Sequence, residues 1–68
     1  MRQRRSGLAR YFVGDKGCES AGCALVYAQG LASSWTHEPR SFYVRDALDK
    51  VFYRVDKDGD GVVRTYTL

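Results

Sequence analysis

The chain has 68 residues, 44% of them hydrophobic, and its aromatic residues are five Tyr, three Phe and one Trp. This composition excludes an intrinsically disordered chain, and the length allows one domain with a core near the lower limit of self-support. No stretch approaches the roughly 18 apolar residues of a membrane span, and no apolar segment follows the basic N-terminus as a secretory signal requires. We therefore expect an intracellular, cytoplasmic domain over residues 1–68, with no membrane partner and with scope to form a homo-oligomer.

The net charge of +3 is unevenly distributed along the chain. Arg2, Arg4, Arg5 and Arg10 contribute +4, so the residues after position 10 sum to 3 − 4 = −1. The basic character thus belongs to an N-terminal arm over residues 1–6 and its surroundings. Such an arm can attract phosphates or acidic proteins, or it can be a terminus with no specific role.

The first half of the chain predicts a strand, a turn and a helix. Residues 8–13 alternate imperfectly between glycines and are expected to form a short strand, and residues 14–17 to form a turn. Residues 19–35 predict an amphipathic helix, capped by Ser20 or Asp15 and ended by Ser33, Ser34 and Pro39. Its apolar positions recur at helical spacing: Ala21, Ala24, Leu25, Ala28, Leu31, Ala32 and Trp35.

The second half predicts a three-stranded antiparallel meander. Residues 41–45, 51–56 and 62–68 are rich in β-branched and aromatic types, and the connectors over 46–50 and 57–61 have the length of hairpin loops. The expected fold is therefore α+β. One helix packs on a small antiparallel sheet in the order β-α-β-β-β, with the N-terminal strand added to that sheet and an edge as its candidate place.

Alternation along the meander predicts which side chains share a face. Pairing Val44 with Val51 and Phe42 with Tyr53 turns one set toward the helix, namely Phe42, Val44, Val51, Tyr53 and Val55. The opposite face then presents Tyr43, Arg45, Phe52 and Arg54, with Arg64 and Tyr66 as further candidates because the register of the second hairpin stays open by one residue. Arginines among exposed rings form a recognition surface in one interpretation and ordinary cross-strand packing in the other.

The segment over 56–67 also resembles the calcium loop of the EF-hand family. Asp56, Asp58 and Asp60 occupy its first, third and fifth positions, with Gly61 at the sharp turn and Val63 after it. The apolar spacing of an entering helix is matched by Leu48, Val51, Phe52 and Val55. The twelfth position is Thr67 instead of glutamate, and the sequence ends at Leu68 without residues for an exiting helix. The hairpin interpretation is the one we favour, with calcium binding as an alternative.

The remaining reactive side chains do not form a recognisable catalytic or metal-binding pattern. Cys18 and Cys23 are expected to be reduced thiols, although a disulfide stays open if Cys18 precedes the helix. His37 is the sole histidine and stands alone in a loop. We therefore expect no enzymatic activity, no cofactor and no metal site.

The expected function is non-enzymatic docking on a macromolecule, with a protein as the partner we favour, through Tyr43, Arg45, Phe52, Arg54, Arg64 and Tyr66. Phage and mobile-element inhibitors of host machinery, including anti-CRISPR proteins, share this size and general character, but no motif supports that analogy. The alternative is nucleic-acid binding by the same face together with Arg2, Arg4, Arg5 and Arg10.

Overall fold

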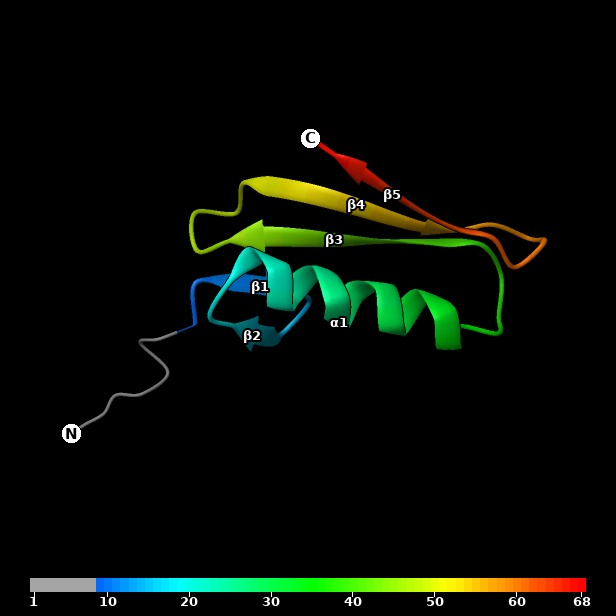
Figure 1. The fold of residues 1–68 in the computed structure, drawn as a ribbon, viewed down its shortest axis with the longest axis horizontal. Helices are drawn as coiled ribbons and strands as arrows, with labels where there is room; N and C mark the ends of the chain where they lie inside the picture. Colours follow the sequence, from blue (N-terminus) through cyan, green and yellow to red (C-terminus); the bar gives the residue numbers. More distant parts are fainter. Residues whose placement is uncertain (1–8) are drawn as a thin grey trace.

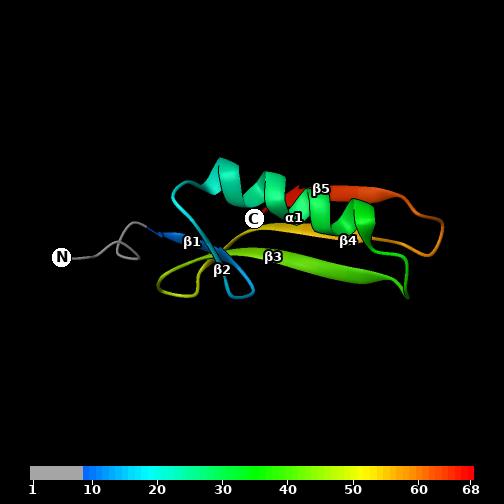
Figure 2. The ribbon, with the colours of Figure 1, turned by 90° about the horizontal axis from the view of Figure 1, so that it is seen from below.

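The computed structural model describes residues 9–68 as one helix packed on a five-stranded antiparallel sheet. The elements in chain order are β1 (Tyr11–Val13), β2 (Lys16–Cys18), α1 (Ala21–Ser34), β3 (Arg40–Asp46), β4 (Val51–Lys57) and β5 (Val63–Thr67). The strand order across the sheet is β2-β1-β3-β4-β5. Figures 1 and 2 show α1 lying along one face of this sheet. The α+β prediction is confirmed, and the arm over residues 1–6 lies outside the described residues.

The sequence prediction missed one strand. Residues 14–17 were predicted to form a turn, whereas only Gly14 and Asp15 connect β1 to β2, and Lys16 and Gly17 belong to β2. Gly14 has a φ of +61°, the left-handed conformation that a two-residue hairpin turn requires. β1 consequently lies inside the sheet, between β2 and β3. Gly17 made β2 difficult to predict, because glycine is uncommon inside strands. The structure explains the glycine at this position: an added Cβ would lie 3.3 Å from the Phe12 ring and 2.8 Å from the Ala9 Cβ.

Helix α1 packs closely on the sheet because its buried face consists of alanines. Ala24, Ala28 and Ala32 are fully buried and recur every fourth residue, which places them on one face. Opposite them lie Phe42, Val44 and Val55 of β3 and β4. Val13 and Cys18 complete the core, and the partly buried residues around it are Tyr11, Leu25, Leu31, Trp35, Tyr53 and Val63. The predicted helical face is confirmed.

Each end of α1 has a capping interaction. At the start, the Ser20 hydroxyl accepts a hydrogen bond from the Cys23 amide at 3.1 Å. At the end, the Lys57 ammonium of β4 donates to the carbonyl oxygens of Ala32 at 2.9 Å and of Trp35 at 2.7 Å. Carbonyls of the last helical turn lack partners within the helix and carry partial negative charge. Lys57 therefore satisfies them and joins the end of the helix to the sheet.

The loops that follow β3 and β4 adopt the same turn. In the first loop, Asp46 Oδ1 accepts from the amides of Leu48 and Lys50, each at 2.9 Å, and Asp49 has a φ of +70°. The Asp46 amide in turn donates to the Lys50 carbonyl at 3.0 Å. This is the three-residue hairpin loop in which a type I turn is followed by a left-handed residue.

The second loop repeats this geometry around another aspartate. Asp58 Oδ1 accepts from the amides of Asp60 and Val62, each at 2.9 Å, and the Asp58 amide donates to the Val62 carbonyl at 3.1 Å. Gly61 occupies the left-handed position with a φ of +87°. The prediction of a hairpin over this segment is confirmed. The EF-hand resemblance implies an entering helix before the loop, but the structure has strand β4 there. The Asp and Gly residues of this segment form a turn between two strands.

The register of the β3–β4 ladder differs from the predicted one by two residues. Phe42 pairs with Val55 and Val44 with Tyr53, where the prediction paired Phe42 with Tyr53 and Val44 with Val51. A shift of two residues keeps every side chain on its face, so the division into inner and outer sets holds for the regular part of the ladder. The ladder then passes from Val44–Tyr53 to Arg45–Val51, which leaves Phe52 as the extra residue of a bulge.

We predict that Lys57→Met destabilises the domain by about 1 to 3 kcal/mol, because it removes a charged donor from the Trp35 carbonyl and from that of Ala32, which keeps only the Trp35 amide as a partner. Chemical denaturation followed by circular dichroism measures this change. Lys50→Met is the matched control, since that ammonium lies 5.3 Å from the centre of the Phe52 ring. The control is expected to cost less than about 1 kcal/mol. Equal losses in the two variants would contradict the assigned role of Lys57.

Candidate functional site

The sheet has one covered face and one open face. Helix α1 contacts the inner face, and within residues 9–68 no element lies across the opposite face (Figures 1 and 2). In residues 53–57 of β4 and in β5, odd-numbered residues point inward, as the buried Val55 and the hydrogen bond from Gln29 of α1 to the Thr65 hydroxyl at 3.0 Å show. Even-numbered residues of these two segments therefore point outward. We call the outward-facing residues of β3, β4 and β5 the outer face: Ser41, Tyr43, Arg45, Arg54, Asp56, Arg64 and Tyr66.

Two tyrosines and an arginine form a row across the middle of the outer face. Tyr43 pairs with Arg54, and Arg54 pairs with Tyr66 on the next strand. Both tyrosines are 38% exposed, in contrast with the fully buried Val44 beside Tyr43. The Arg54 guanidinium carbon lies 4.6 Å from the centre of the Tyr66 ring, and that of Arg45 lies 5.4 Å from the Tyr43 ring. The rings and guanidinium groups thus lie against one another, in the range of cation–π contacts.

Every arginine of the outer face has an aspartate beside it. Arg45 lies 3.5 Å from Asp49, Arg54 lies 3.2 Å from Asp56, and Arg64 lies 3.0 Å from Asp58. Among residues 9–68, no acceptor is aligned for a hydrogen bond with the buried Nε–H of Arg54, so its contact with Asp56 is an ion pair only. Exposed pairs of this kind add little stability, but they fix the guanidinium positions and neutralise the surface locally.

Two of the carboxylates beside these arginines, those of Asp56 and Asp58, also accept hydrogen bonds from other groups of the chain. Asp56 Oδ1 accepts from the Ser41 hydroxyl at 2.7 Å, on the strand opposite. Asp58 takes the amides of its turn on one oxygen and Arg64 on the other. The hydrogen bond from the Val62 amide is the largest cause that lowers the pKa of Asp58, with further contributions from the Asp60 amide and Arg64.

The structure places the predicted contact residues as follows. Five of the six lie on the outer face: Tyr43, Arg45, Arg54, Arg64 and Tyr66. Phe52 was predicted to be an exposed ring on that face, and this prediction is wrong. Its side chain is half-buried, and its ring meets Tyr11 edge to face with the centroids 5.5 Å apart. The bulge redirects Phe52, and strict alternation cannot anticipate a bulge.

The residues named for the other interpretations lie apart from this row. Arg10 is exposed, and its amide donates to the Cys18 carbonyl at 3.0 Å, whereas Arg2, Arg4 and Arg5 lie outside the described residues. Asp56 is on a strand and Asp58 is inside a turn, so they do not form a calcium loop with Asp60. Within residues 9–68, no group of three or more His, Cys, Asp and Glu side chains is placed to hold a metal ion.

The cysteines are both free thiols. Cys18 is buried at the end of β2, before the helix, and Cys23 is exposed in the first turn of α1. Burial raises the pKa of the Cys18 thiol, and the neighbouring Cys23 thiol raises it further. No helix in the described part of the chain is long and apolar enough to cross a membrane.

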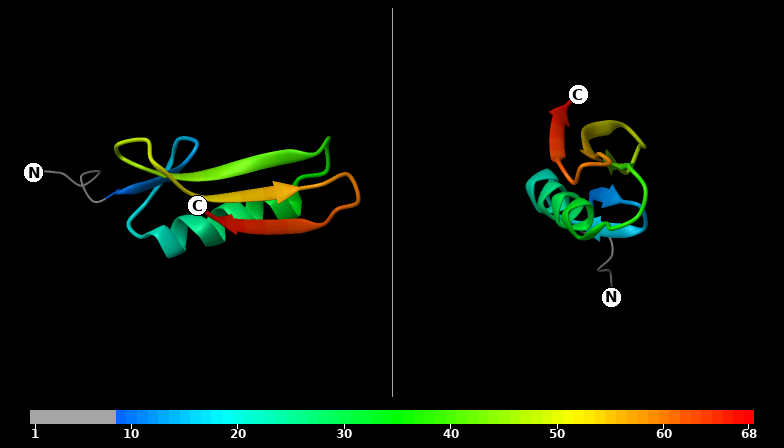
Figure 3. Two further views of the ribbon diagram at one scale, coloured as in Figure 1. Left: turned by 90° about the horizontal axis from the view of Figure 1, so that it is seen from above. Right: turned by 90° about the vertical axis from the view of Figure 1, so that its right-hand side faces the viewer.

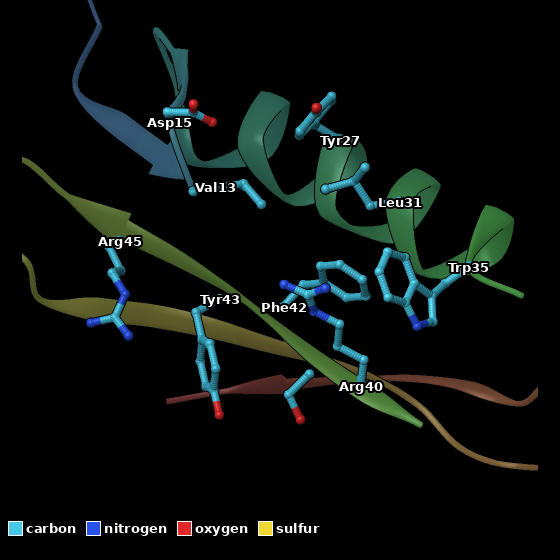
Figure 4. Close-up of a pocket in the computed structure, with 11 residues that line it drawn as sticks. Val13, Asp15, Tyr27, Leu31, Trp35, Arg40, Phe42, Tyr43 and Arg45 are labelled. Atoms are coloured by element: carbon cyan, nitrogen blue, oxygen red, sulfur yellow. The ribbon is translucent and has the colours of Figure 1, made fainter. Parts of the chain in front are cut away.

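A groove of about 420 Å³ lies between α1 and the first half of β3. Figure 4 shows Phe42 turned into it, toward Leu31 and Trp35, while Tyr43 and Arg45 point away from the helix. The Arg40 guanidinium carbon lies 4.6 Å from the centre of the Trp35 ring and 5.3 Å from that of Phe42. Arg40 thus lines this groove beside the two rings, whereas the outer face presents its rings and guanidinium groups on three neighbouring strands, and we take the outer face as the candidate binding site.

Comparison of the chain with models of protein families, with curated proteins and with solved structures finds no match in any of the three. What can be stated of this protein is therefore its structural class: it is a small α+β domain in which one face of the sheet is open and bears tyrosine rings and arginines.

The pKa of Asp58 predicts a pH dependence. Because the folded state lowers this pKa below its ordinary value of 3.8, ionised Asp58 stabilises the fold above that pH. This stabilisation is lost as the pH falls through the folded-state pKa. Asp58→Asn keeps an oxygen for the turn amides but cannot ionise, so the variant should be less stable than the wild type near neutral pH. The difference should shrink below pH 3.8.

Unfolding midpoints measured in denaturant across the acid range test this prediction. Asp60→Asn is the control, because it changes a carboxylate of the same loop that, unlike that of Asp58, accepts no hydrogen bond from the described residues. A difference for Asp58→Asn that persists unchanged in strong acid would show that its charge does not stabilise the turn.

Proposed function

We propose that this domain is a non-catalytic binding protein that docks on another protein through the outer face. The observation that carries the proposal is the row Tyr43–Arg54–Tyr66, in which two half-exposed rings flank a guanidinium group on three neighbouring strands. Tyrosine and arginine are the residues most enriched among those that dominate binding energy at protein interfaces. A flat sheet also holds such side chains more rigidly than a loop does.

The rings and guanidinium groups of the outer face already lie against one another without a partner, and this pre-organisation supports binding. Arg54 lies over Tyr66 and Arg45 over Tyr43 before any partner arrives. Immobilising a flexible side chain at an interface costs about 0.5 to 1.5 kcal/mol, so side chains that are held beforehand lose less on binding. Asp49, Asp56 and Asp58 hold the guanidinium groups from the sides and leave the rings open to a partner.

The charge balance favours a protein partner over a nucleic acid. Residues 9–68 contain 11 − 3 = 8 basic residues, because Arg2, Arg4 and Arg5 lie before them, and all 8 acidic residues of the chain. The outer-face arginines also have carboxylate neighbours at 3.0 to 3.5 Å. A surface that neutralises phosphates requires basic groups in excess, whereas mixed charge among aromatic rings suits a protein surface.

The proposed role is that of a small regulator or inhibitor that covers part of its partner. The engagement of Asp56 with Ser41 and Arg54, and of Asp58 with its turn and Arg64, supports a structural role for these carboxylates over a chemical one. Inhibition of host machinery, as by phage-encoded anti-CRISPR proteins, is one form that such covering takes. That form rests on size and character alone.

We predict that Tyr43→Ala and Tyr66→Ala each weaken partner binding at least about tenfold, since each removes a central ring. The measurement is capture of the partner from a lysate of the source organism, followed by titration of the purified partner. Val26→Ser is the matched control, because Val26 is 69% exposed on the helix, remote from the outer face, and it should bind like the wild type.

The same experiment separates the two classes of partner. Nuclease treatment should leave the captured protein in place, and the affinity should fall only weakly with salt. Release by nuclease, or a steep linear fall of log affinity with log salt, would instead identify a nucleic acid as the ligand. Wild-type binding by both tyrosine variants would contradict the outer face as the contact surface.

A further inference from the structure

Strand β5 ends the sheet with an open backbone edge. The Leu68 amide donates to the Phe52 carbonyl at 3.0 Å and the Asp58 amide to the Val62 carbonyl at 3.1 Å, so even-numbered residues of this segment direct their backbone groups toward β4. By alternation, the amide and carbonyl groups of Val63, Thr65 and Thr67 point away from β4. Figure 3 shows β5 at the margin of the sheet, and β5 is the last strand in the sheet order of residues 9–68.

The two edges of the sheet differ in how they are protected. The edge strand β2 has three residues, one of them Gly17, and Lys16 is exposed on it. Shortness and an edge lysine are recognised devices against strand addition. β5 has five residues with the sequence Val-Arg-Thr-Tyr-Thr, and its pairing with β4 shows no bulge and no proline. Its free edge is therefore competent to accept another strand.

The residues of β5 complement a second copy of themselves. In an antiparallel pairing centred on Thr65, every outward amide meets an outward carbonyl, because Val63 lies opposite Thr67 of the second copy. On the outer face, Arg64 then lies opposite Tyr66 of the second copy, which repeats the Arg54–Tyr66 contact seen within one chain. Val62 and Leu68, exposed at 43% and 66%, lie opposite each other in the same register.

Neighbouring registers are less favourable. Centring the pair on Arg64 places two guanidinium groups directly opposite each other, which is destabilising in a sheet. Centring it on Tyr66 puts Arg64 opposite Leu68 and leaves fewer residues of β5 paired. The register centred on Thr65 is the one that pairs all five residues of the strand.

We propose that two copies of this chain associate through antiparallel pairing of β5 with β5 about Thr65. The pairing joins two five-stranded sheets into one, so the outer face of one copy continues into that of the other. A single strand edge buries less than the roughly 1,200 Å² of a stable interface, so the dimer should dissociate on dilution. The proposal rests on the edge of β5 and does not depend on the proposed protein partner.

Sedimentation equilibrium of the full chain from about 1 μM to about 1 mM tests the dimer. The weight-average mass of the wild type should rise from the 7.7 kDa of one chain toward twice that value. Thr65→Pro removes an amide that points to the free edge and not to β4, so it should weaken dimerisation at least about tenfold.

Thr65→Val is the matched control for this variant, because it loses the hydroxyl that accepts from Gln29 but keeps the edge amide, and it should dimerise normally. Tyr43→Ala should also dimerise, which separates edge pairing from stacking of the outer faces. Circular dichroism verifies that each variant folds. A single-chain mass at every concentration, or unchanged dimerisation of Thr65→Pro, would overturn the proposal.

Cysteine cross-linking tests the register without relying on a proline. In a Cys23→Ser background, Thr65→Cys places two thiols on directly opposed residues about 5.5 Å apart at Cα, within the range of a disulfide. Val63→Cys places them on residues that face Thr67 of the second copy instead. Oxidation should therefore link the Thr65→Cys variant and not the Val63→Cys variant. Equal linkage, or linkage of Val63→Cys alone, would exclude the proposed register.

Discussion

The close contact between the alanine face of α1 and the sheet is the constraint on which the rest of the structure depends. Ala24, Ala28 and Ala32 bring the helix backbone near Val44 and Val55, the two largest side chains that are fully buried. The core that results is small, as expected for a chain of this length. Because one helix supplies its only covering layer in residues 9–68, the sheet can bury only one of its faces.

The helix needs support from the sheet in return. Gly22 and Gly30 both lie within α1, and each lowers helix propensity by about 1 kcal/mol relative to Ala. Lys57 offsets part of this cost, because β4 delivers its ammonium to the carbonyls at the helix end. The same strand carries Arg54 on its other face. Strand β4 therefore links the stability of the core to the organisation of the outer face.

The helix and the meander could be predicted from the sequence, because the residue patterns that indicate them are local. Alanines and leucines at helical spacing, and runs of Val, Tyr and Thr, report directly on which elements form. The division of β3 and β4 into two faces also held outside the bulge at Phe52, since an error of two residues in register preserves side-chain direction. The location of Tyr43, Arg54 and Tyr66 on one face was therefore predictable, although their alignment in one row was not.

The features that sequence reasoning missed depend on contacts between distant segments. Phe52 turns toward Tyr11 at a bulge, and Lys57 reaches a helix that ends more than twenty residues earlier in the chain. Strand β2 contains a glycine whose place is explained only by its close neighbours, the Ala9 Cβ and the Phe12 ring. One overlooked signal was local: Asp46 and Asp58 each begin a hairpin loop, and this repetition indicates two turns of the same type.

The sheet has one face buried under the helix and one open face, and the rings of Tyr43 and Tyr66 lie on the open face. Nuclear magnetic resonance with a soluble paramagnetic probe measures this directly, because the probe broadens only the signals that it can approach. We predict strong broadening of the ring signals of Tyr43 and Tyr66 and little effect on Phe42, which is 8% exposed. Protected tyrosine rings together with a broadened Phe42 would contradict it.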